Sequence, residues 1–101
     1  MAKRKQFKPG FRHNNSPKSK GHPTYVYGES GNEYKYLGIT HSSKSGHKKN
    51  YELLKNPNPN DTRKAYVRKQ AQKDKKHFFG KLLQSGSFSE KDSKNIKKYM
   101  K

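Results

Sequence analysis

Fourteen Leu, Ile, Val and Phe residues are the main apolar supply from which this chain can build a core. They have to be covered by a surface with 25 Lys and Arg residues against seven Asp and Glu residues, a formal net charge of +18. Low apolar content with high net charge is typical of disordered chains. Seven tyrosines and five phenylalanines act in the opposite direction, because each aromatic ring buries a large area. The composition therefore predicts one small domain with a thin core and a polycationic surface.

Several classes of protein are excluded by the same composition. No apolar run is long enough for a transmembrane helix or for the hydrophobic part of a signal peptide. The chain has no cysteine, which excludes disulfides and Cys-based zinc sites and fits a reducing compartment. We therefore expect a cytoplasmic protein without a membrane partner.

A charge of +18 repels itself and calls for an anionic partner, of which nucleic acid is the commonest. Lysines outnumber arginines by 21 to 4. Lysine acts as a point charge, whereas arginine reads base edges with two parallel hydrogen bonds, so the excess of lysine favours phosphate contacts. The charge predicts a nucleic-acid-binding protein with affinity for the phosphate backbone, and the cleavage chemistry considered below favours RNA over DNA as its partner.

Residues 1–20 differ in composition from the rest of the chain. They carry seven positive charges and no acidic residue, and Pro9, Gly10 and Pro17 interrupt them. This pattern predicts a disordered basic arm over residues 1–20, followed by a single domain over residues 21–101.

Two β-rich runs, residues 24–27 and 33–40, flank a turn rich in Gly, Ser and Asn, which predicts an antiparallel hairpin. Alternation places Lys35, Leu37 and Ile39 on one face, and Tyr34 and Tyr36 on the other. The tyrosines are expected to belong to the core, because the chain has little else to bury.

Two further short strands are expected at residues 51–54 and 65–68. Between them, residues 56–61 contain two prolines and several asparagines, which cannot continue a helix or a strand. Alternation in the second strand puts Tyr66 and Arg68 on one face.

The last third of the chain has helical spacing. Phe78, Phe79, Leu82 and Leu83 predict a helix over residues 76–83. Ser89 has the character of an N-cap for a final helix that continues through Ile96, Tyr99 and Met100. The expected fold is α+β: a small twisted antiparallel sheet of three or four strands, packed against one or two helices.

The residues available for chemistry favour reactions without a metal ion. The acidic residues are scattered rather than clustered, so we expect neither a metal site nor a cofactor. Cleavage of RNA can proceed without either, because the substrate's own 2′-hydroxyl attacks the adjacent phosphate. The protein then supplies a base, an acid and cations.

Candidates for these roles follow from their positions. His41 ends a strand and is the expected general base, while His22 precedes the partner strand. Arg63 and Arg68 are expected to hold phosphate, and Tyr66 to stack on a base or donate a proton. The candidate catalytic residues are His41, His22, Arg68 and Tyr66, and the candidate nucleic-acid-binding residues are Lys35, Lys48, Lys49, Arg63, Arg4 and Arg12.

These candidates also have ordinary structural interpretations. His22 can cap the start of a strand, His41 can be a turn residue that forms hydrogen bonds with the loop, and Arg68 can be a solvated cation. The alternative function is therefore a non-enzymatic RNA- or DNA-binding protein, either an accessory factor of a mobile element or a ribosome-associated protein. The composition fits this alternative equally well.

Five segments, Gly21–Tyr27, Leu37–Ser42, Asn56–Pro59, Ala65–Arg68 and Phe79–Lys81, resemble small basic proteins of bacterial mobile elements. Those proteins are similar to the barnase–EndoU–colicin–RelE nuclease superfamily, and the resemblance covers roughly residues 21–100. It implies a twisted antiparallel sheet on helices and a toxin that cuts RNA without metal, with a neutralising antitoxin as a possible partner.

Within that superfamily, two sets of active residues are compatible with this chain. His22 and His41 with Lys35 suit one style, and Lys35, Arg63, Tyr66 and Arg68 suit the RelE style. A second similarity links Tyr25-Val26-Tyr27 and Tyr36-Leu37-Gly38 to the GIY and YIG motifs of a metal-dependent nuclease family. Here the first motif lacks its glycine and no metal-binding Glu follows.

Overall fold

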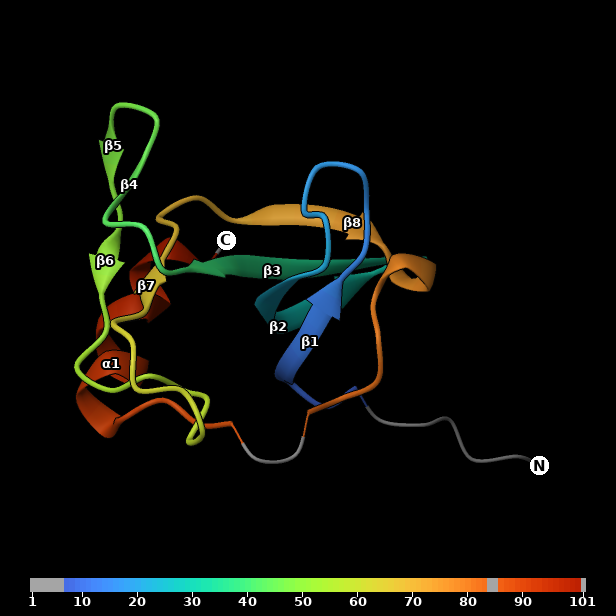
Figure 1. The fold of residues 1–101 in the computed structure, drawn as a ribbon. Coiled ribbons are helices and arrows are strands. Elements are labelled where there is room, and N and C mark those ends of the chain that lie inside the picture. Colours follow the sequence, from blue (N-terminus) through green and yellow to red (C-terminus); the bar gives the residue numbers. More distant parts are fainter. Residues whose placement is uncertain (1–6, 84–85, 101) are drawn as a thin grey trace.

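The computed structural model describes residues 7–83 and 86–100 of the chain, and its fold is α+β, as expected (Figure 1). The larger antiparallel sheet has six strands, more than the three or four expected. The elements in chain order are β1 (Gly10–Asn14), β2 (His22–Ser30), β3 (Glu33–Thr40), β4 (Lys44–Ser45), β5 (Lys48–Lys49), β6 (Tyr51–Glu52), β7 (Tyr66–Val67), β8 (Gln72–Lys75), the 3-10 turn η1 (Lys76–Phe78), α1 (Glu90–Ile96) and the 3-10 turn η2 (Lys97–Tyr99).

Strand β3 is the centre of the sheet and explains why the number of strands was underestimated. The strands follow the order β1-β2-β3-β7-β6, and β8 also pairs with β3. The first half of β3 pairs with β8, from Glu33 to Tyr36, and the second half pairs with β7, at Ile39 and Thr40. One long strand therefore serves two short partners on the same edge. Strands β4 and β5 form a separate two-stranded hairpin.

The predicted hairpin of residues 24–40 is confirmed as β2 and β3. Tyr25 pairs with Leu37 and Val26 with Tyr36, and a bulge follows between Val26 and Gly28. The turn itself is tighter than expected and needs Gly31, whose φ of 60° is favourable only for glycine. The predicted alternation also holds, because Leu37 lies in the main apolar cluster, whereas Tyr36 is equally buried but lies outside that cluster, where its hydroxyl donates to Asp74.

The expectation of a disordered arm over residues 1–20 is wrong for its described part. Residues 10–14 form β1, which pairs with β2 from Gly10 opposite Val26 to Asn14 opposite His22. Phe11 on this strand is 6% exposed, and its ring packs against Phe88 and Tyr25. The domain therefore begins before residue 21, and residues 1–6 lie outside the described residues.

A buried polar network ties β1 to the other side of the sheet. One carboxylate oxygen of Asp74, Oδ2, accepts hydrogen bonds from Asn14 Nδ2 at 2.9 Å, Ser16 Oγ at 3.0 Å and Tyr36 O–H at 2.9 Å. Burial alone would raise the pKa of the Asp74 carboxyl, but these hydrogen bonds outweigh it and bring the pKa below its ordinary value. Burial and the same carboxylate raise the pKa of Tyr36 to about 12.

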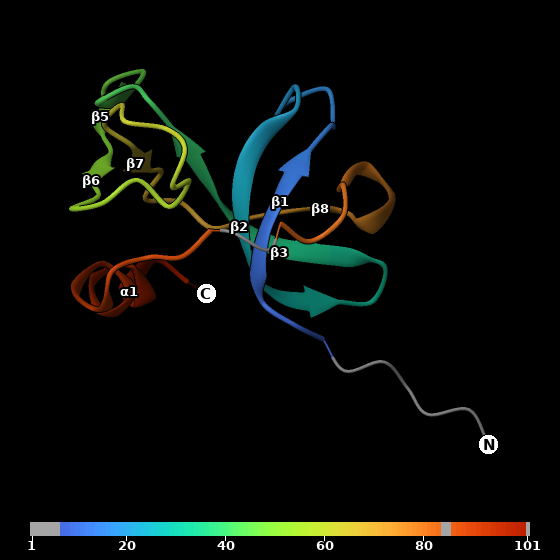
Figure 2. The same ribbon diagram turned by 60° about the horizontal axis from the view of Figure 1, so that its bottom comes forward.

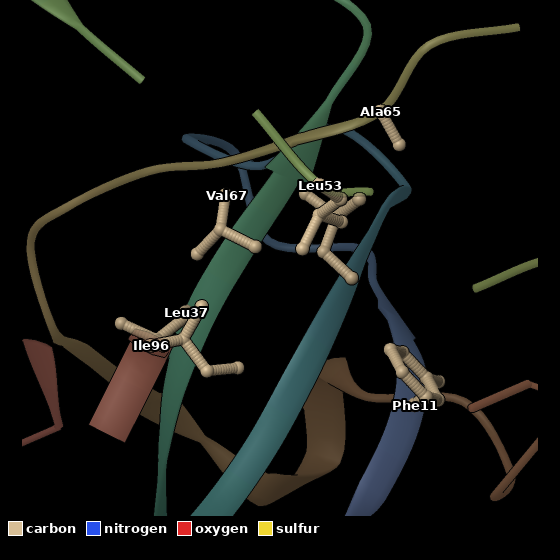
Figure 3. Packing of buried hydrophobic residues seen from close by; sticks show 7 residues of the cluster. Phe11, Leu37, Leu53, Ala65, Val67 and Ile96 are labelled. Atoms are coloured by element: carbon tan, nitrogen blue, oxygen red, sulfur yellow. The ribbon is translucent and has the colours of Figure 1, made fainter. Parts of the chain in front are cut away.

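The apolar core occupies the opposite face of the sheet, and α1 packs against it near β6 and β7 through Ile96 (Figures 2 and 3). Ser89 is the N-cap, because its hydroxyl accepts from Asp92 N–H at 3.1 Å, as the sequence predicted. The fully buried Asp92 carboxylate accepts from Tyr51 O–H and Leu54 N–H, which fastens the helix to β6. The core residues are Phe11, Leu37, Ile39, Leu53, Ala65, Val67 and Ile96.

The helix expected over residues 76–83 is wrong. After the short turn η1, the chain is extended and runs along the outer edge of β1. Gly80 N–H donates to His13 O at 2.9 Å and Leu83 N–H donates to Phe11 O at 2.8 Å. The free edge of β1 offers backbone groups that must be paired, and this demand overrides the helical spacing of the apolar residues.

Replacing Asp74 with Asn should lower the free energy of unfolding by about 1–3 kcal/mol at neutral pH, because three buried donors lose a charged acceptor. The measurement is urea unfolding of both proteins. Glu52→Gln, an exposed residue of β6, is the control and should change little. An equal loss in both variants would contradict the role given to the network.

The same network predicts the acid dependence of stability. The pKa of Asp74 is lowered in the folded protein, so its contribution is complete above the ordinary value of 3.8 and disappears as the pH falls through the folded value. Stability of the wild type should therefore drop more steeply below pH 3.8 than that of Asp74→Asn.

Candidate functional site

Two cavities lie at one end of the β2–β3 ladder, and Pro23 and Ile39 line both of them. His13 and His41 line the larger cavity, whereas His22 and Thr40 line the smaller one. Because successive side chains of a strand point to opposite faces, the two cavities open on opposite faces of the sheet. The larger has a volume of about 330 Å³, and its polar lining consists of His13, His41, Asn56, Asn58, Asn60 and Asp61. The smaller has a volume of about 140 Å³, and its lining includes Lys18, His22, Thr40, Ser45 and Arg68.

His41 lies in the larger cavity, directly after the end of β3. Its ring Nδ1 is 3.2 Å from Lys64 O, and its Nε2 is 3.3 Å from Asp61 Oδ2. A carbonyl oxygen can only accept, so Nδ1 carries a proton in this arrangement. Asp61 Oδ2 can therefore accept a hydrogen bond from Nε2 whenever that nitrogen carries a proton.

Asp61 is held in its ionised form by its neighbour Arg63. The Arg63 guanidinium donates from Nε to Oδ1 at 3.1 Å and from Nη2 to Oδ2 at 3.0 Å, and the Arg63 N–H also donates to Oδ1. These bonds, with a smaller contribution from the charge of His41, lower the pKa of Asp61 to about 2. A carboxylate with so low a pKa remains charged beside His41 at any physiological pH.

The asparagine- and proline-rich turn builds the wall that carries Asp61. Asn56 Oδ1 accepts from Asn58 N–H at 2.9 Å, and Asn58 Oδ1 accepts from Asn60 N–H at 3.0 Å. Asn56 Nδ2 closes the loop by donating to Arg63 O. The expectation of a turn without helix or strand over residues 56–61 is confirmed, and local side-chain bonds explain its shape.

His13 is the second histidine of the larger cavity, and the sequence analysis did not select it. It pairs with Pro23 in the β1–β2 ladder, and its Nδ1 is 3.1 Å from Gly21 O. Nδ1 is therefore the donor, and the neutral ring keeps a lone pair on Nε2. The prediction of disorder over residues 1–20 hid this residue, although Phe11 and its polar neighbours already show the alternation of a strand.

The other candidate catalytic residues do not line the larger cavity with His41. His22 and Arg68 line the smaller cavity, and His22 Nδ1 is 2.6 Å from Ser19 O. Tyr66 lies in β7, opposite Thr40. The structure therefore does not bring the four proposed catalytic residues into one site.

Two of the proposed nucleic-acid-binding lysines lie on an exposed projection of the fold. Lys48 and Lys49 form β5, in a hairpin that projects from the rest of the molecule (Figure 1). Asn50 holds the base of this hairpin by donating to Ser42 O at 3.0 Å and Ser45 Oγ at 2.9 Å. The hydrogen bonds of Asn50 thus stabilise the hairpin that exposes Lys48 and Lys49 to solvent.

The remaining candidates are in less open positions. Lys35 is half-buried in β3, opposite Gly28 and Lys73. Arg12 donates to Gly80 O at 2.8 Å and lies over the Tyr34 ring, so its guanidinium is engaged within the fold. Arg4 lies outside the described residues.

Over the described ranges 7–83 and 86–100, no three His, Asp or Glu side chains are grouped closely enough to hold a metal ion. In the same ranges, no helix has the length and apolar character needed to cross a membrane.

Substituting Arg63 with Gln should raise the pKa of Asp61 from about 2 towards its ordinary value of 3.8, since the guanidinium is the main cause of the shift. Carbon-detected NMR titration of the Asp61 carboxyl measures this pKa directly. The Lys64→Gln variant removes the adjacent charge without touching Asp61 and should leave the titration nearly unchanged. Equal shifts in both variants would show a diffuse field instead of a specific pair.

Comparison with protein-family models, with curated proteins and with solved structures gave no match. A proposal about function therefore depends on the charges, cavities and side-chain geometry of this chain, together with the sequence resemblance described above.

Proposed function

We propose that this protein binds nucleic acid and cleaves RNA without a metal ion, with His13 and His41 as the proton-transfer groups. The observation that supports this proposal most directly is that both histidines line one open cavity, with His41 against the ionised Asp61. The net charge of +18 supplies the attraction for a polyanionic substrate. The resemblance of the sequence to the barnase–EndoU–colicin–RelE superfamily points to the same chemistry.

The hydrogen bonds of the two rings suggest different roles for them. His13 has a lone pair on Nε2 when neutral and can take the proton of the 2′-hydroxyl as that oxygen attacks phosphorus. The bond from phosphorus to the 5′-oxygen then breaks, and His41 can protonate this leaving oxygen. The products are a 2′,3′-cyclic phosphate and a free 5′-hydroxyl. His41, expected from the sequence to be the base, is thus proposed as the acid.

The dimensions and lining of the larger cavity agree with a nucleotide as its occupant. Its volume of about 330 Å³ is at the lower end of the range for small-molecule sites. Phe11, Ile39 and Leu83 supply apolar surface for a base, and the asparagines of the 56–61 turn supply polar groups at the edge. Such a combination can hold a base by apolar contact with its ring and hydrogen bonds to its edge.

A ribonuclease of this type would be toxic to the cell that makes it. We therefore propose a neutralising protein partner as part of the same function, as the resemblance to mobile-element toxins implies. We therefore expect the wild type to be difficult to express without such a partner. Variants in which the cavity histidines are replaced should be easier to express.

Cleavage should be lost when either histidine of the cavity is removed. His41→Ala and His13→Ala should each reduce the rate by about 10²–10⁴-fold, because each removes a general acid or base. The assay follows labelled total RNA on a gel in excess EDTA. His77→Ala is the matched control, since His77 is exposed and stacks on Phe78 instead of lining the cavity.

Cleavage at full rate by His41→Ala would contradict the role of that residue. A band shift without cleavage, which added Mg²⁺ or Mn²⁺ also fails to start, would identify a non-enzymatic nucleic-acid-binding protein instead.

The affinity for single-stranded RNA should depend on Lys48 and Lys49 of the projecting hairpin, and the salt dependence of binding measures this contribution. If Lys48 and Lys49 each contact one phosphate of single-stranded RNA, the slope of log K against log[salt] is reduced by about 0.7 per contact when they are replaced with Gln. Lys91→Gln with Lys94→Gln, on α1, gives the same change of net charge at another place. Identical slopes in the two double variants would show that the hairpin has no special part in binding.

A further inference from the structure

We propose that the smaller cavity binds one phosphate group of a nucleic-acid backbone, with Arg68, Lys18 and His22 as its cations. This inference rests on the nucleic-acid binding in the proposed function and is independent of cleavage. The volume of about 140 Å³ is well below that of sites for whole small molecules, so a single compact group fits it better than a nucleotide.

Arg68 is the most available cation of this cavity. Its stem packs over Gly38, where a Cβ atom would lie only 3.0 Å from Arg68 Cδ. Its guanidinium takes part in no hydrogen bond or ion pair with residues 7–83 or 86–100. Gly38 therefore lets the stem lie flat across β3, while the donors remain for a ligand. Bidentate binding of a phosphate is the usual use of such a fork.

His22 and Lys18 are held at the rim by contacts that leave donors unused. His22 Nδ1 donates to Ser19 O, so Nε2 can face a ligand and donates to it when the ring is protonated. Lys18 donates to Lys73 O at 3.2 Å and lies 3.7 Å from Asp74 Oδ1. The ammonium group has three donors, so it can also reach an anion.

Two hydroxyl groups of the lining are arranged as donors. Thr40 Oγ1 accepts from Ser42 N–H at 3.1 Å, and Ser45 Oγ accepts from Asn50 Nδ2 at 2.9 Å. Because each oxygen already accepts a bond from the protein, its own proton is left for an acceptor in the cavity. None of the described lining residues is acidic. The nearby Asp74 directs its Oδ2 to three other donors. The ligand that satisfies this donor-rich lining is an anion.

The position of the cavity suggests that the anion belongs to a nucleic acid. Pro23 and Ile39 line both the smaller cavity and the histidine cavity. A single nucleic-acid strand that crosses this end of the sheet can therefore reach both cavities. Ser45 also belongs to β4, in the hairpin that carries Lys48 and Lys49. A phosphate in the cavity would therefore lie beside the cationic hairpin, at a cavity that shares two lining residues with the proposed site of cleavage.

The inference is tested by NMR titration of the full chain with inorganic phosphate, followed by displacement with a single-stranded DNA oligonucleotide. DNA lacks the 2′-hydroxyl, so failure of the cleavage proposal does not affect this measurement. Saturable shifts are expected at the His22 ring and at the amides of Thr40 and Ser45. Arg68→Gln should weaken phosphate binding about tenfold or more, since it removes charge-assisted hydrogen bonds.

Two further variants make the result specific. Lys69→Gln removes the same charge at the next residue, which does not line the cavity, and should leave phosphate affinity nearly unchanged. Ser45→Ala removes one donor without altering net charge and should weaken binding. Equal effects of Arg68→Gln and Lys69→Gln, or no effect of Arg68→Gln, would overturn the site. Phosphate that the oligonucleotide cannot displace would overturn its assignment to a nucleic-acid backbone.

Discussion

The Asp74 carboxylate joins segments that lie far apart in the sequence, and the position of the N-terminal strand depends on it. Its Oδ2 accepts from Asn14 at the end of β1, from Ser16 in the following turn and from Tyr36 in β3. These bonds hold residues 14–20 against β8, and Asn14 and Ser16 become almost fully buried. This chain has few apolar residues, so the hydrogen bonds of this buried carboxylate supply part of the stability that a larger apolar core provides in other proteins.

The hydrogen bonds of Asp74 also affect the candidate site, because they fix the position of β1. Since β1 is held beside β2, His13 lies opposite Pro23 and lines the same cavity as His41. The extended segment after η1 closes the outer edge of β1 and contributes Leu83 to the cavity. The hydrogen bonds of Asp74 on one face of the sheet therefore help to position His13 on the other face. They hold β1 in its pairing with β2, and this backbone pairing fixes where the His13 side chain lies.

The two cavities divide the chemistry of the molecule. The larger one combines histidines, a permanently ionised aspartate and apolar surface, which fits proton transfer beside a base. The smaller one combines cations with hydroxyl donors, which fits an anion that is held rather than transformed. The proposed functions follow this division, with cleavage assigned to the first cavity and phosphate binding to the second. In the same proposal, the remaining lysines attract the nucleic acid over a longer range, which requires charge but little geometry.

Local patterns in the sequence determined the β2–β3 hairpin, the turn of residues 56–61, the N-cap at Ser89 and the polycationic surface. Each of these depends on neighbouring residues, such as the glycine at the turn or the alternation of Leu37 and Ile39 with the tyrosines. By contrast, β1, β8 and the extended course of residues 79–83 required tertiary structure, because an edge strand forms only when another segment pairs with it. Composition made residues 1–20 resemble a disordered arm, whereas Asp74, 54 residues beyond the end of that segment, orders its described part. The same holds for the site: His41 and Arg68 could be selected from their sequence positions, but only the folded sheet decided that His13 joins His41 and that His22 and Arg68 lie on the opposite face.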